Sequence, residues 1–298
     1  MDLRKRREED LRKGKRTTFA KRMRTAIIAV ILTTVITTIA VDATDNLGNF
    51  SDSIVGTAVS GLFSKQETGP CPGGMVFVSS SNGGFCIDSY ENSPSSECLF
   101  SEPANQNETT TNLENRLCKA VSAGGKMPWR NVALQQAEIL CAREGKHLPS
   151  NEEWYLASLG TPDSPGNVDR GDCNVKGQGV LEAGSKALCV SSYGAHDMIG
   201  NVWEWVAETV VDGTFDTRTL PNEGYVTSVD TKGVPVTTNA SSSDPSFYED
   251  YFWVEKNGVR GMIRGGYFGN GTDAGQFTIN AITPTSFTGA AVGFRCAK

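Results

Sequence analysis

Residues 25–41, TAIIAVILTTVITTIAV, form an uncharged run of Ile, Val, Ala and Thr close to the start of the chain. A helix needs roughly 17–25 such residues to span a membrane, so the pattern predicts one spanning helix. Residues 1–24 hold 11 Lys and Arg against four acidic residues. Because Lys and Arg concentrate on the cytoplasmic side of spanning helices, we expect this basic leader inside and the rest of the chain outside.

Residues 42–70 keep apolar side chains at the spacing of one helix face. This pattern favours a stalk or an extension of the spanning helix. Together with the basic leader it also resembles a small Flp-type pilin subunit, although the acidic residue usual near the start of a pilin's apolar run is missing. We therefore expect a single-pass protein of the cell membrane with its C-terminal domain outside. A pilus-associated or secreted protein is the alternative.

The body of the chain, residues 71–298, alternates short apolar runs with polar stretches, which predicts few helices and many short strands. Two strands are expected on either side of residues 82–84, Asn-Gly-Gly, a sequence typical of hairpin turns. The stretches 91–115, 160–192 and 212–250 are rich in small and polar residues and are expected to be loops.

Two helices are expected between the first and second of these stretches. Asn131 is the expected N-cap of a helix that ends at Gly145. Ser150 and Glu153 have the spacing of a capping box and predict the start of the second helix.

The charge of the chain is unevenly distributed. The net charge is −6, but 17 basic and 30 acidic residues follow residue 24, so the exported part carries −13. Nucleic acid binding depends on clustered cations that neutralise phosphates. The acidic body therefore argues against a nucleic-acid partner.

All eight cysteines lie beyond the apolar run, which predicts disulfides in an oxidising compartment. Eight cysteines allow 105 pairings, and the spacing favours only one local bridge, between Cys173 and Cys189. The chain has no Cys-x-x-Cys pair and two histidines, which argues against a zinc site. The cysteines are Cys71, Cys86, Cys98, Cys118, Cys141, Cys173, Cys189 and Cys296.

Four short blocks of the body occur together in one known family. They are GKHLPSNEEWYLAS (145–158), GAHDMIGNVWEWVAE (194–208), IRGGYF (263–268) and VGFRCAK (292–298). In this order they resemble the formylglycine-generating-enzyme, or sulfatase-modifying-factor, type of the C-type-lectin fold. The resemblance covers residues 71–298. It implies an α+β, loop-rich and disulfide-stapled domain, preceded here by the expected transmembrane helix.

Residues of these blocks are expected to build the scaffold. Trp203 and Trp205 have the bulk to fill a core beneath a strand, and Asn201 and Glu204 are suited to pin adjacent loops. Relatives hold structural calcium in this region, and its oxygen atoms suit that ion. The scaffold residues implied by the signature are Gly200, Asn201, Trp203, Glu204, Trp205, Arg264, Gly265, Gly266, Gly293, Phe294 and Arg295.

The resemblance also bears on catalysis. Formylglycine-generating enzymes bind copper through two cysteines of the C-terminal block, because thiolates are soft metal ligands. Between Arg264 and Arg295 this chain has neither cysteine nor histidine, and His147 and His196 are too few for the His-rich site of iron-dependent relatives. We therefore expect no reaction, no catalytic residue and no catalytic cofactor. An enzyme with an unrecognised site is the alternative.

The block RGGYFGNGTDAGQFTINAITPTSFTGAAVGFRC further resembles the diversified region of variable proteins of diversity-generating retroelements. Those elements mutate positions opposite template adenines, and this chain departs from the block mostly where the pattern has Asn, whose codons are adenine-rich. The resemblance implies a variable region at about 264–295. Its candidate ligand-binding positions are Tyr267, Phe268, Gly269, Asn270, Asp273, Gln276, Ile282, Thr283, Phe287, Gly289 and Ala291.

Apolar residues of this region are expected to divide between surface and core. Phe268, Ile282 and Phe287 are expected to be exposed anchors for a partner. The sequence thus predicts a membrane-anchored variable receptor or adhesin that binds a protein or other surface ligand of another cell, a virus or a host. The residues expected in the core are Phe277, Ile279 and Phe294.

Overall fold

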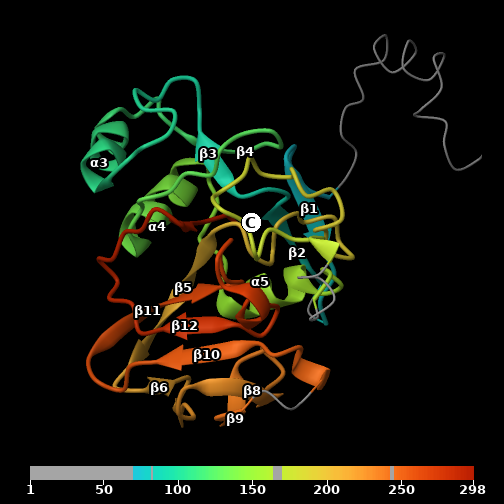
Figure 1. The fold of residues 1–298 in the computed structure, drawn as a ribbon. Helices are drawn as coiled ribbons and strands as arrows, with labels where there is room; N and C mark the ends of the chain where they lie inside the picture. Colours follow the sequence, from blue (N-terminus) through green and yellow to red (C-terminus); the bar gives the residue numbers. More distant parts are fainter. Residues whose placement is uncertain (1–69, 82, 164–169, 242–244) are drawn as a thin grey trace, which may run out of the picture. The chain divides into compact units, whose positions relative to one another are not determined.

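The computed structural model describes residues 70–81, 83–163, 170–241 and 245–298 (Figure 1). The expected basic leader, the expected transmembrane helix and nearly all of the expected stalk lie outside these residues. Among the helices that are described, none combines the length and the apolar character needed to cross a bilayer.

A mixed sheet of nine strands is the largest sheet of the described residues, and Figure 1 shows most of it in the lower half of the view. The strand order is β7-β6-β5-β11-β12-β10-β8-β9, with β13 paired to β5 outside this path. Two small sheets, β1-β2 and β3-β4, lie in the N-terminal half of the domain. The strands are β1 (Met75–Val78), β2 (Phe85–Asp88), β3 (Asn92–Pro94), β4 (Ala120–Ser122), β5 (Trp203–Val211), β6 (Thr214–Phe215), β7 (Arg218–Thr219), β8 (Gly224–Val229), β9 (Pro235–Asn239), β10 (Tyr251–Val254), β11 (Val259–Arg264), β12 (Ile279–Ala281) and β13 (Val292–Gly293).

Two core clusters lie on opposite faces of the large sheet. Trp203 and Trp205 of β5 belong to one cluster, and Val206 of the same strand belongs to the other, as the alternation of side chains along a strand requires. The two tryptophans belong to β5 itself, and their rings are buried in the cluster on one face of the sheet, as expected of core residues. Helix α4 (Leu134–Arg143) packs into the tryptophan cluster, and helix α5 (Asn151–Ser158) packs into the second.

The expected hairpin and the second expected helix are confirmed. Strands β1 and β2 pair antiparallel, with Val78 opposite Phe85, so the expected turn lies between the two strands. At the start of α5, the Ser150 hydroxyl accepts from the Glu153 N–H at 3.2 Å, and the Ser150 N–H donates to the Glu153 carboxylate at 2.8 Å. Helix α4 begins later than expected, because Asn131 has a left-handed backbone with φ of 57° and its side-chain amide donates to a distant carbonyl. The N-cap is Ala133.

The polar stretch 91–115 is not the loop that its composition predicts. It contains β3 and the helix α3 (Gln106–Glu114). This helix has almost no apolar side chains, and its buried positions are polar. Thr109, for example, accepts from the Trp129 indole N–H at 3.2 Å. A helix held by polar contacts lacks the apolar period on which recognition from sequence depends.

Residues 212–250, also expected to be a loop, contain strands β6 to β9 and the 3-10 helix η2 (Pro245–Phe247). Short strands with Ser and Thr on their outer face resemble loops in composition. Ser228 and Thr237, for example, join β8 to β9 through hydroxyls 2.5 Å apart. The described part of 160–192 is mostly turns and irregular backbone, as expected.

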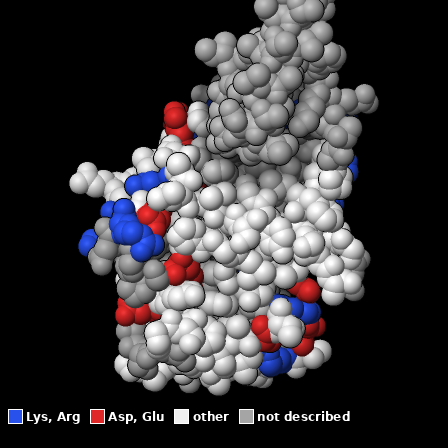
Figure 2. All heavy atoms as spheres, turned by 90° about the vertical axis from the view of Figure 1, so that its right-hand side faces the viewer, with Lys and Arg blue, Asp and Glu red and all other residues white. Residues whose placement is uncertain are grey.

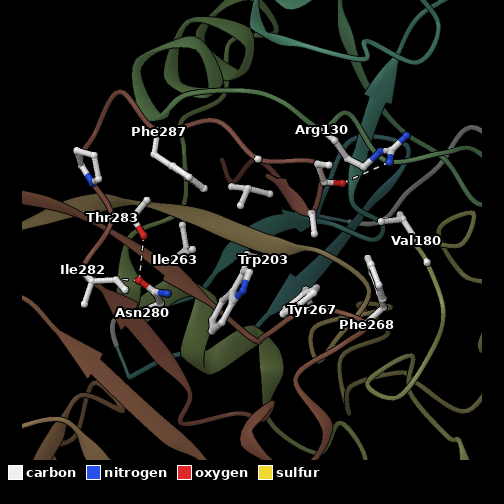
Figure 3. Close-up of a pocket in the computed structure, with 16 residues that line it drawn as sticks. Arg130, Val180, Trp203, Ile263, Tyr267, Phe268, Asn280, Ile282, Thr283 and Phe287 are labelled. Carbon is white, nitrogen blue, oxygen red and sulfur yellow. Dashed lines mark hydrogen bonds between the residues drawn. The ribbon is translucent and has the colours of Figure 1, made fainter.

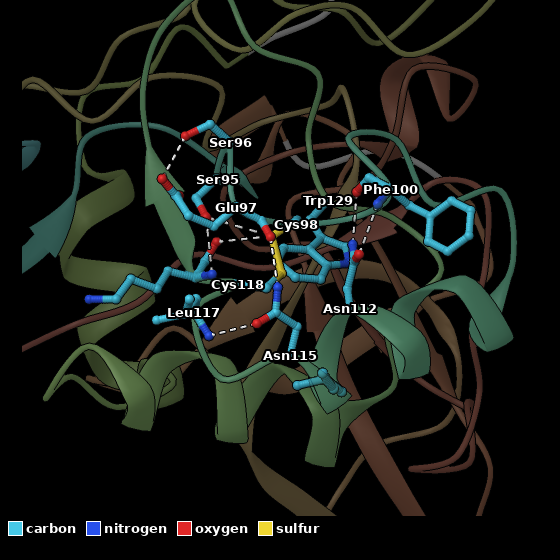
Figure 4. Close-up of a disulfide and its surroundings, with 12 residues drawn as sticks. Ser95, Ser96, Glu97, Cys98, Phe100, Asn112, Asn115, Leu117, Cys118 and Trp129 are labelled. Atoms are coloured by element: carbon cyan, nitrogen blue, oxygen red, sulfur yellow. Dashed lines mark hydrogen bonds between the residues drawn. A yellow bond between two sulfur atoms is a disulfide. The ribbon is translucent and has the colours of Figure 1, made fainter.

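All eight cysteines are joined in disulfides, and the expected local bridge is confirmed. The bridge between α4 and the last residues of the chain spans 155 residues of sequence. Another closes the loop that carries α3, and Figure 4 shows it next to Asn112 and Trp129. The pairs are Cys71–Cys86, Cys98–Cys118, Cys141–Cys296 and Cys173–Cys189.

Figure 2 shows the face of the molecule on the right-hand side of Figure 1. Basic and acidic side chains lie next to one another at the margins of this face, and its centre is largely uncharged. This distribution differs from the broad basic field that binds nucleic acid.

Candidate ligand-binding site

An apolar pocket with a volume of about 690 Å³ opens over strands β5, β11 and β12 (Figure 3). Most of its lining comes from the region 264–295, which is expected to be variable. Seven of the eleven candidate positions line it, although they are spread over 25 residues of sequence. These are Tyr267, Phe268, Ile282, Thr283, Phe287, Gly289 and Ala291.

The remaining candidate positions do not line this pocket, and two of them help to shape the chain beside it. The Asn270 side-chain oxygen accepts from the Tyr267 N–H at 2.9 Å and so holds the turn between them. The backbone N–H of Gln276 donates to the Asp163 carboxylate at 2.8 Å. The four positions outside the lining are Gly269, Asn270, Asp273 and Gln276.

The floor of the pocket belongs to the core of the fold. Trp203 of β5, Ile263 of β11 and Val292 of β13 are 6%, 2% and 4% exposed, so only a small part of each side chain faces the pocket. Trp253 packs edge-on against Trp203, with ring centroids 5.8 Å apart. Close packing of this kind makes the floor rigid.

One wall is formed by Tyr267 and Phe268, whose rings meet edge to face at 5.0 Å. The backbone of Phe268 is held by residues outside the variable region. The Phe268 N–H donates to the Asn201 carbonyl at 3.1 Å, and the Phe268 carbonyl accepts from the Gly177 N–H at 2.7 Å. A change of side chain at these positions leaves both hydrogen bonds intact.

The opposite wall is the loop that carries Ile282 and Phe287, which are 42% and 40% exposed. Their expected exposure is confirmed, whereas Phe268 is half-buried. The loop backbone is tied to the N-terminus of α4, because the Asn131 N–H donates to the Gly289 carbonyl at 3.0 Å. Three residues of the region were expected in the core, and all three are buried: Phe277, Ile279 and Phe294.

Sequence reasoning missed several lining residues that come from outside the variable region. Arg130, Gly179 and Val180 line the pocket and come from segments more than 80 residues before the variable region. No periodicity or motif relates these residues to the C-terminal block, and only the packing of the chain brings them together. Arg130 is the only charged residue among those that line the pocket.

A buried ion pair supports the strands beneath this pocket. Arg295 binds Glu204 through two hydrogen bonds of 2.6 and 2.7 Å, and the two side chains are 0% and 1% exposed. The Trp154 indole N–H donates to the same carboxylate at 2.7 Å. Glu204 thereby joins β5, α5 and the C-terminal segment.

Asn201 has a similar role. Its side-chain oxygen accepts from the Asn174 side chain and from the Leu181 N–H, each at 2.9 Å, and its amide donates to Glu91 at 2.7 Å. Burial raises the pKa of Glu91 well above its usual value. Calcium takes six to eight oxygen ligands. The side-chain oxygens of Asn201 and Glu204 already accept hydrogen bonds from protein donors. These two residues therefore do not fit as ligands of the structural calcium ion that relatives hold in this region.

The described residues contain no group of three or more His, Cys, Asp or Glu placed to hold a metal ion. His147 is paired with Glu153 at 3.1 Å, and His196 stacks on Tyr90 with ring centroids 4.8 Å apart. Because every cysteine is in a disulfide, none is a free thiolate that could bind copper. The lining of the pocket is mostly apolar, which suits the burial of an apolar group.

Two buried carboxyl groups hold the variable region just before β12. Asp163 accepts from the Gln276 N–H at 2.8 Å, and Asp250 accepts from the Phe277 N–H at 2.6 Å. Burial raises the pKa of Asp163 to about 7 and the pKa of Asp250 well above its usual value. The folded protein therefore holds protons that the unfolded chain releases near pH 4.

We expect the substitution Asp163→Asn to flatten the dependence of stability on pH. A raised pKa contributes stability that is complete below the pKa of the unfolded chain, near 4, and is lost as the pH rises through about 7. Each pH unit within that window changes the free energy of unfolding by up to about 1.4 kcal/mol. Urea unfolding should show that the free energy of unfolding falls less between pH 5 and pH 8 in the variant than in the unchanged protein. An equal fall in both proteins would contradict the prediction.

Comparison with known proteins places these features in context. The family model described as sulfatase-modifying factor enzyme 1-like domain matches residues 81–298. Among curated proteins, the inactive C-alpha-formylglycine-generating enzyme 2 of Mus musculus is 28% identical over 122 residues, and the protein of the same name from Bos taurus is 29% identical. Each match covers 35% of this chain and 40% of the relative, so the chain spans less than half the length of these relatives.

Solved structures show more distant likenesses. The Major Tropism Determinant U1 variant has a TM-score of 0.43 and 16% identity, with 77% of this chain and 53% of that chain covered. Treponema denticola variable protein 1 has a TM-score of 0.38 and 14% identity, with 76% of this chain and 99% of that chain covered.

Proposed function

The chain belongs to the sulfatase-modifying factor enzyme 1-like family, and from this membership and its pocket we propose that it is a non-catalytic, surface-displayed variable receptor or adhesin. The observation that carries the proposal is the convergence of seven candidate variable positions on one apolar pocket. Among them, the backbone of Phe268, Gly289 and Ala291 is held by hydrogen bonds to residues outside the variable region. Side-chain changes there alter the binding surface and leave the scaffold in place.

Three observations support a role without catalysis. The family's copper chemistry needs free thiolates, and here every cysteine is paired. No acidic residue, lysine, histidine or cysteine lines the pocket, and these are the side chains that most often transfer protons in enzymes. The curated relatives that match part of the chain are themselves named inactive.

We also propose the arrangement of the chain at the cell surface. Residues 25–41 anchor the protein, residues 1–24 lie in the cytoplasm, and the stalk 42–70 carries the binding domain 71–298 outside. Disulfides support exposure to an oxidising compartment. The ligand is then a protein or other molecule on the surface of another cell, a virus or a host. A pilus-associated adhesin would differ by assembly of its N-terminal segment into filaments.

Sequencing this gene in close relatives, together with its flanking DNA, tests the diversification. We expect substitutions to concentrate at positions 269, 273, 282, 283, 287, 289 and 291, with a reverse transcriptase gene and an imperfect repeat of the block nearby. Codons for the Trp203 signature are the internal reference. A block as invariant as that signature, without a neighbouring reverse transcriptase, would refute the variable role and favour a fixed ligand.

A matched pair of phenylalanine substitutions separates binding surface from scaffold. Phe287→Ala is expected to change the free energy of unfolding by less than about 1 kcal/mol, because the side chain is 40% exposed. Phe294→Ala should cost about 3–5 kcal/mol, because that ring is fully buried. Binding of the uncharged apolar dye N-phenyl-1-naphthylamine, followed by its fluorescence, should weaken in the Phe287 variant. Comparable destabilisation by both substitutions would contradict the assignment of Phe287 to a variable surface.

A further inference from the structure

Hydrogen-bond donors line the pocket. In Figure 3 no dashed line runs to the indole nitrogen of Trp203 or to the side-chain nitrogen of Asn280, so neither group donates to another residue of the pocket lining. The oxygen of the same Asn280 amide is already used, because it accepts from the Ile282 N–H at 3.1 Å and from the Thr283 hydroxyl at 2.9 Å. Trp203 and Asn280 therefore offer N–H donors to a ligand, whereas the side-chain oxygen of Asn280 is already used as an acceptor.

Arg130 adds a positive charge to these donors. One of its terminal nitrogens donates to the Ala290 carbonyl at 3.3 Å. The carboxylate of Glu102 lies 3.9 Å from the other terminal nitrogen, which is too far for a hydrogen bond. The guanidinium carries five N–H donors, so most of them have no short protein contact. The side chain is 22% exposed, and its ion-pair partner Glu102 lies outside the pocket lining.

The positions of the donors indicate the shape of the ligand. Arg130 lies on the side of the pocket next to Val180 and Phe268, and Asn280 lies on the side of Ile282, with Trp203 between them (Figure 3). A lipid or other amphiphile concentrates its acceptors at one end. A polypeptide segment carries carbonyl oxygens along its length, and it suits donors that are spread across an apolar floor.

We propose that the pocket binds a protein partner through a segment in which a bulky apolar side chain stands next to a carboxylate. The apolar side chain packs between Trp203 and Phe287, and the carboxylate accepts from Arg130. Arginine is suited to this contact because its planar guanidinium binds a carboxylate through two parallel hydrogen bonds. This inference rests on the proposed function and adds the chemistry of the partner to it.

The net charge of the domain does not attract an acidic partner, so the contact with Arg130 acts only at short range. Residues 70–298 carry 16 Lys and Arg against 26 Asp and Glu, so the domain as a whole repels an acidic partner at long range. Charges at the rim of an interface mainly steer association, whereas a contact within the interface mainly slows dissociation. The effect of Arg130 should accordingly appear in the dissociation rate.

The test compares two peptides that differ only in charge. The full-length protein is titrated with acetyl-Leu-Phe-Asp-Gly-amide and with acetyl-Leu-Phe-Asn-Gly-amide, and both affinities are measured by saturation-transfer NMR. We expect the Asp peptide to bind about fivefold more tightly, as a charge-assisted hydrogen bond of modest strength allows. Arg130→Ala should abolish that preference, Arg130→Lys should keep part of it, and Glu102→Gln should increase it. Arg260→Ala is the control, because Arg260 does not line the pocket.

The outcomes separate this inference from the proposed function. Equal affinities for the two peptides, unchanged in Arg130→Ala, would overturn the inference and leave the pocket as an apolar binding site. Tighter binding of the Asn peptide would also overturn it. Absence of binding of both peptides at millimolar concentration, with dye binding unaffected by Phe287→Ala, would overturn the inference and the proposed binding role of the pocket together.

Discussion

Replacement of Glu204 by alanine is expected to lower the free energy of unfolding by about 3–5 kcal/mol. The substitution leaves the guanidinium of Arg295 fully buried without its two charge-assisted hydrogen bonds. It also removes the acceptor of the Trp154 indole N–H, so α5 loses a contact to β5. A buried charge without its partner is far more costly than the loss of the same contact in water. Urea unfolding followed by tryptophan fluorescence measures the change.

An exposed ion pair provides the control for this prediction. Lys232 and Asp216 lie 2.8 Å apart, but their side chains are 41% and 63% exposed. Lys232→Met should leave the stability almost unchanged, because water screens such pairs. A loss below about 1 kcal/mol for Glu204→Ala would show that the pair contributes no more than an exposed one. The proposed scaffold role of the Glu204–Arg295 pair would then be wrong.

Simultaneous replacement of Cys141 and Cys296 by alanine is expected to cost about 4–5 kcal/mol of unfolding free energy. The bridge closes a segment with a sequence separation of 155, and it restricts the unfolded chain more than any other disulfide of the protein. It also holds the last residues against α4, next to the segment that carries Arg295. The measurement is urea unfolding of the double variant under non-reducing conditions.

The matched control is removal of the bridge between Cys98 and Cys118, which spans only 20 residues. The same relation between loop length and entropy gives about 3 kcal/mol for that loop. The variant without Cys141–Cys296 should therefore be the less stable of the two. The opposite order would show that contacts around α3, and not loop entropy, dominate the effect of these disulfides.

The features predicted correctly from sequence are those whose determinants lie close together in the chain. The capping box at Ser150 and Glu153 and the hairpin at residues 82–84 each depend on a few neighbouring residues. The bridge between Cys173 and Cys189 is likewise local, with a separation of 16. The family resemblance rests on four ungapped blocks, and the family match over residues 81–298 confirms it.

The features predicted wrongly depend on partners that are distant in sequence. Helix α3 shows no apolar period, because its buried residues form polar contacts with the segment around Trp129. Asn131 has the composition of an N-cap, but its side chain donates to the Pro103 carbonyl, and α4 begins further along the chain.

The sequence by itself determined the family, and it predicted the disulfides and the positions at which variation is expected, because these features depend on residue identity. Only the tertiary structure decided that Tyr267, Ile282 and Phe287 share one pocket, and that Arg130 and Val180 complete it. The physical reason is that a pocket forms where separate segments pack. Its shape and charge come from side chains whose proximity no local pattern encodes.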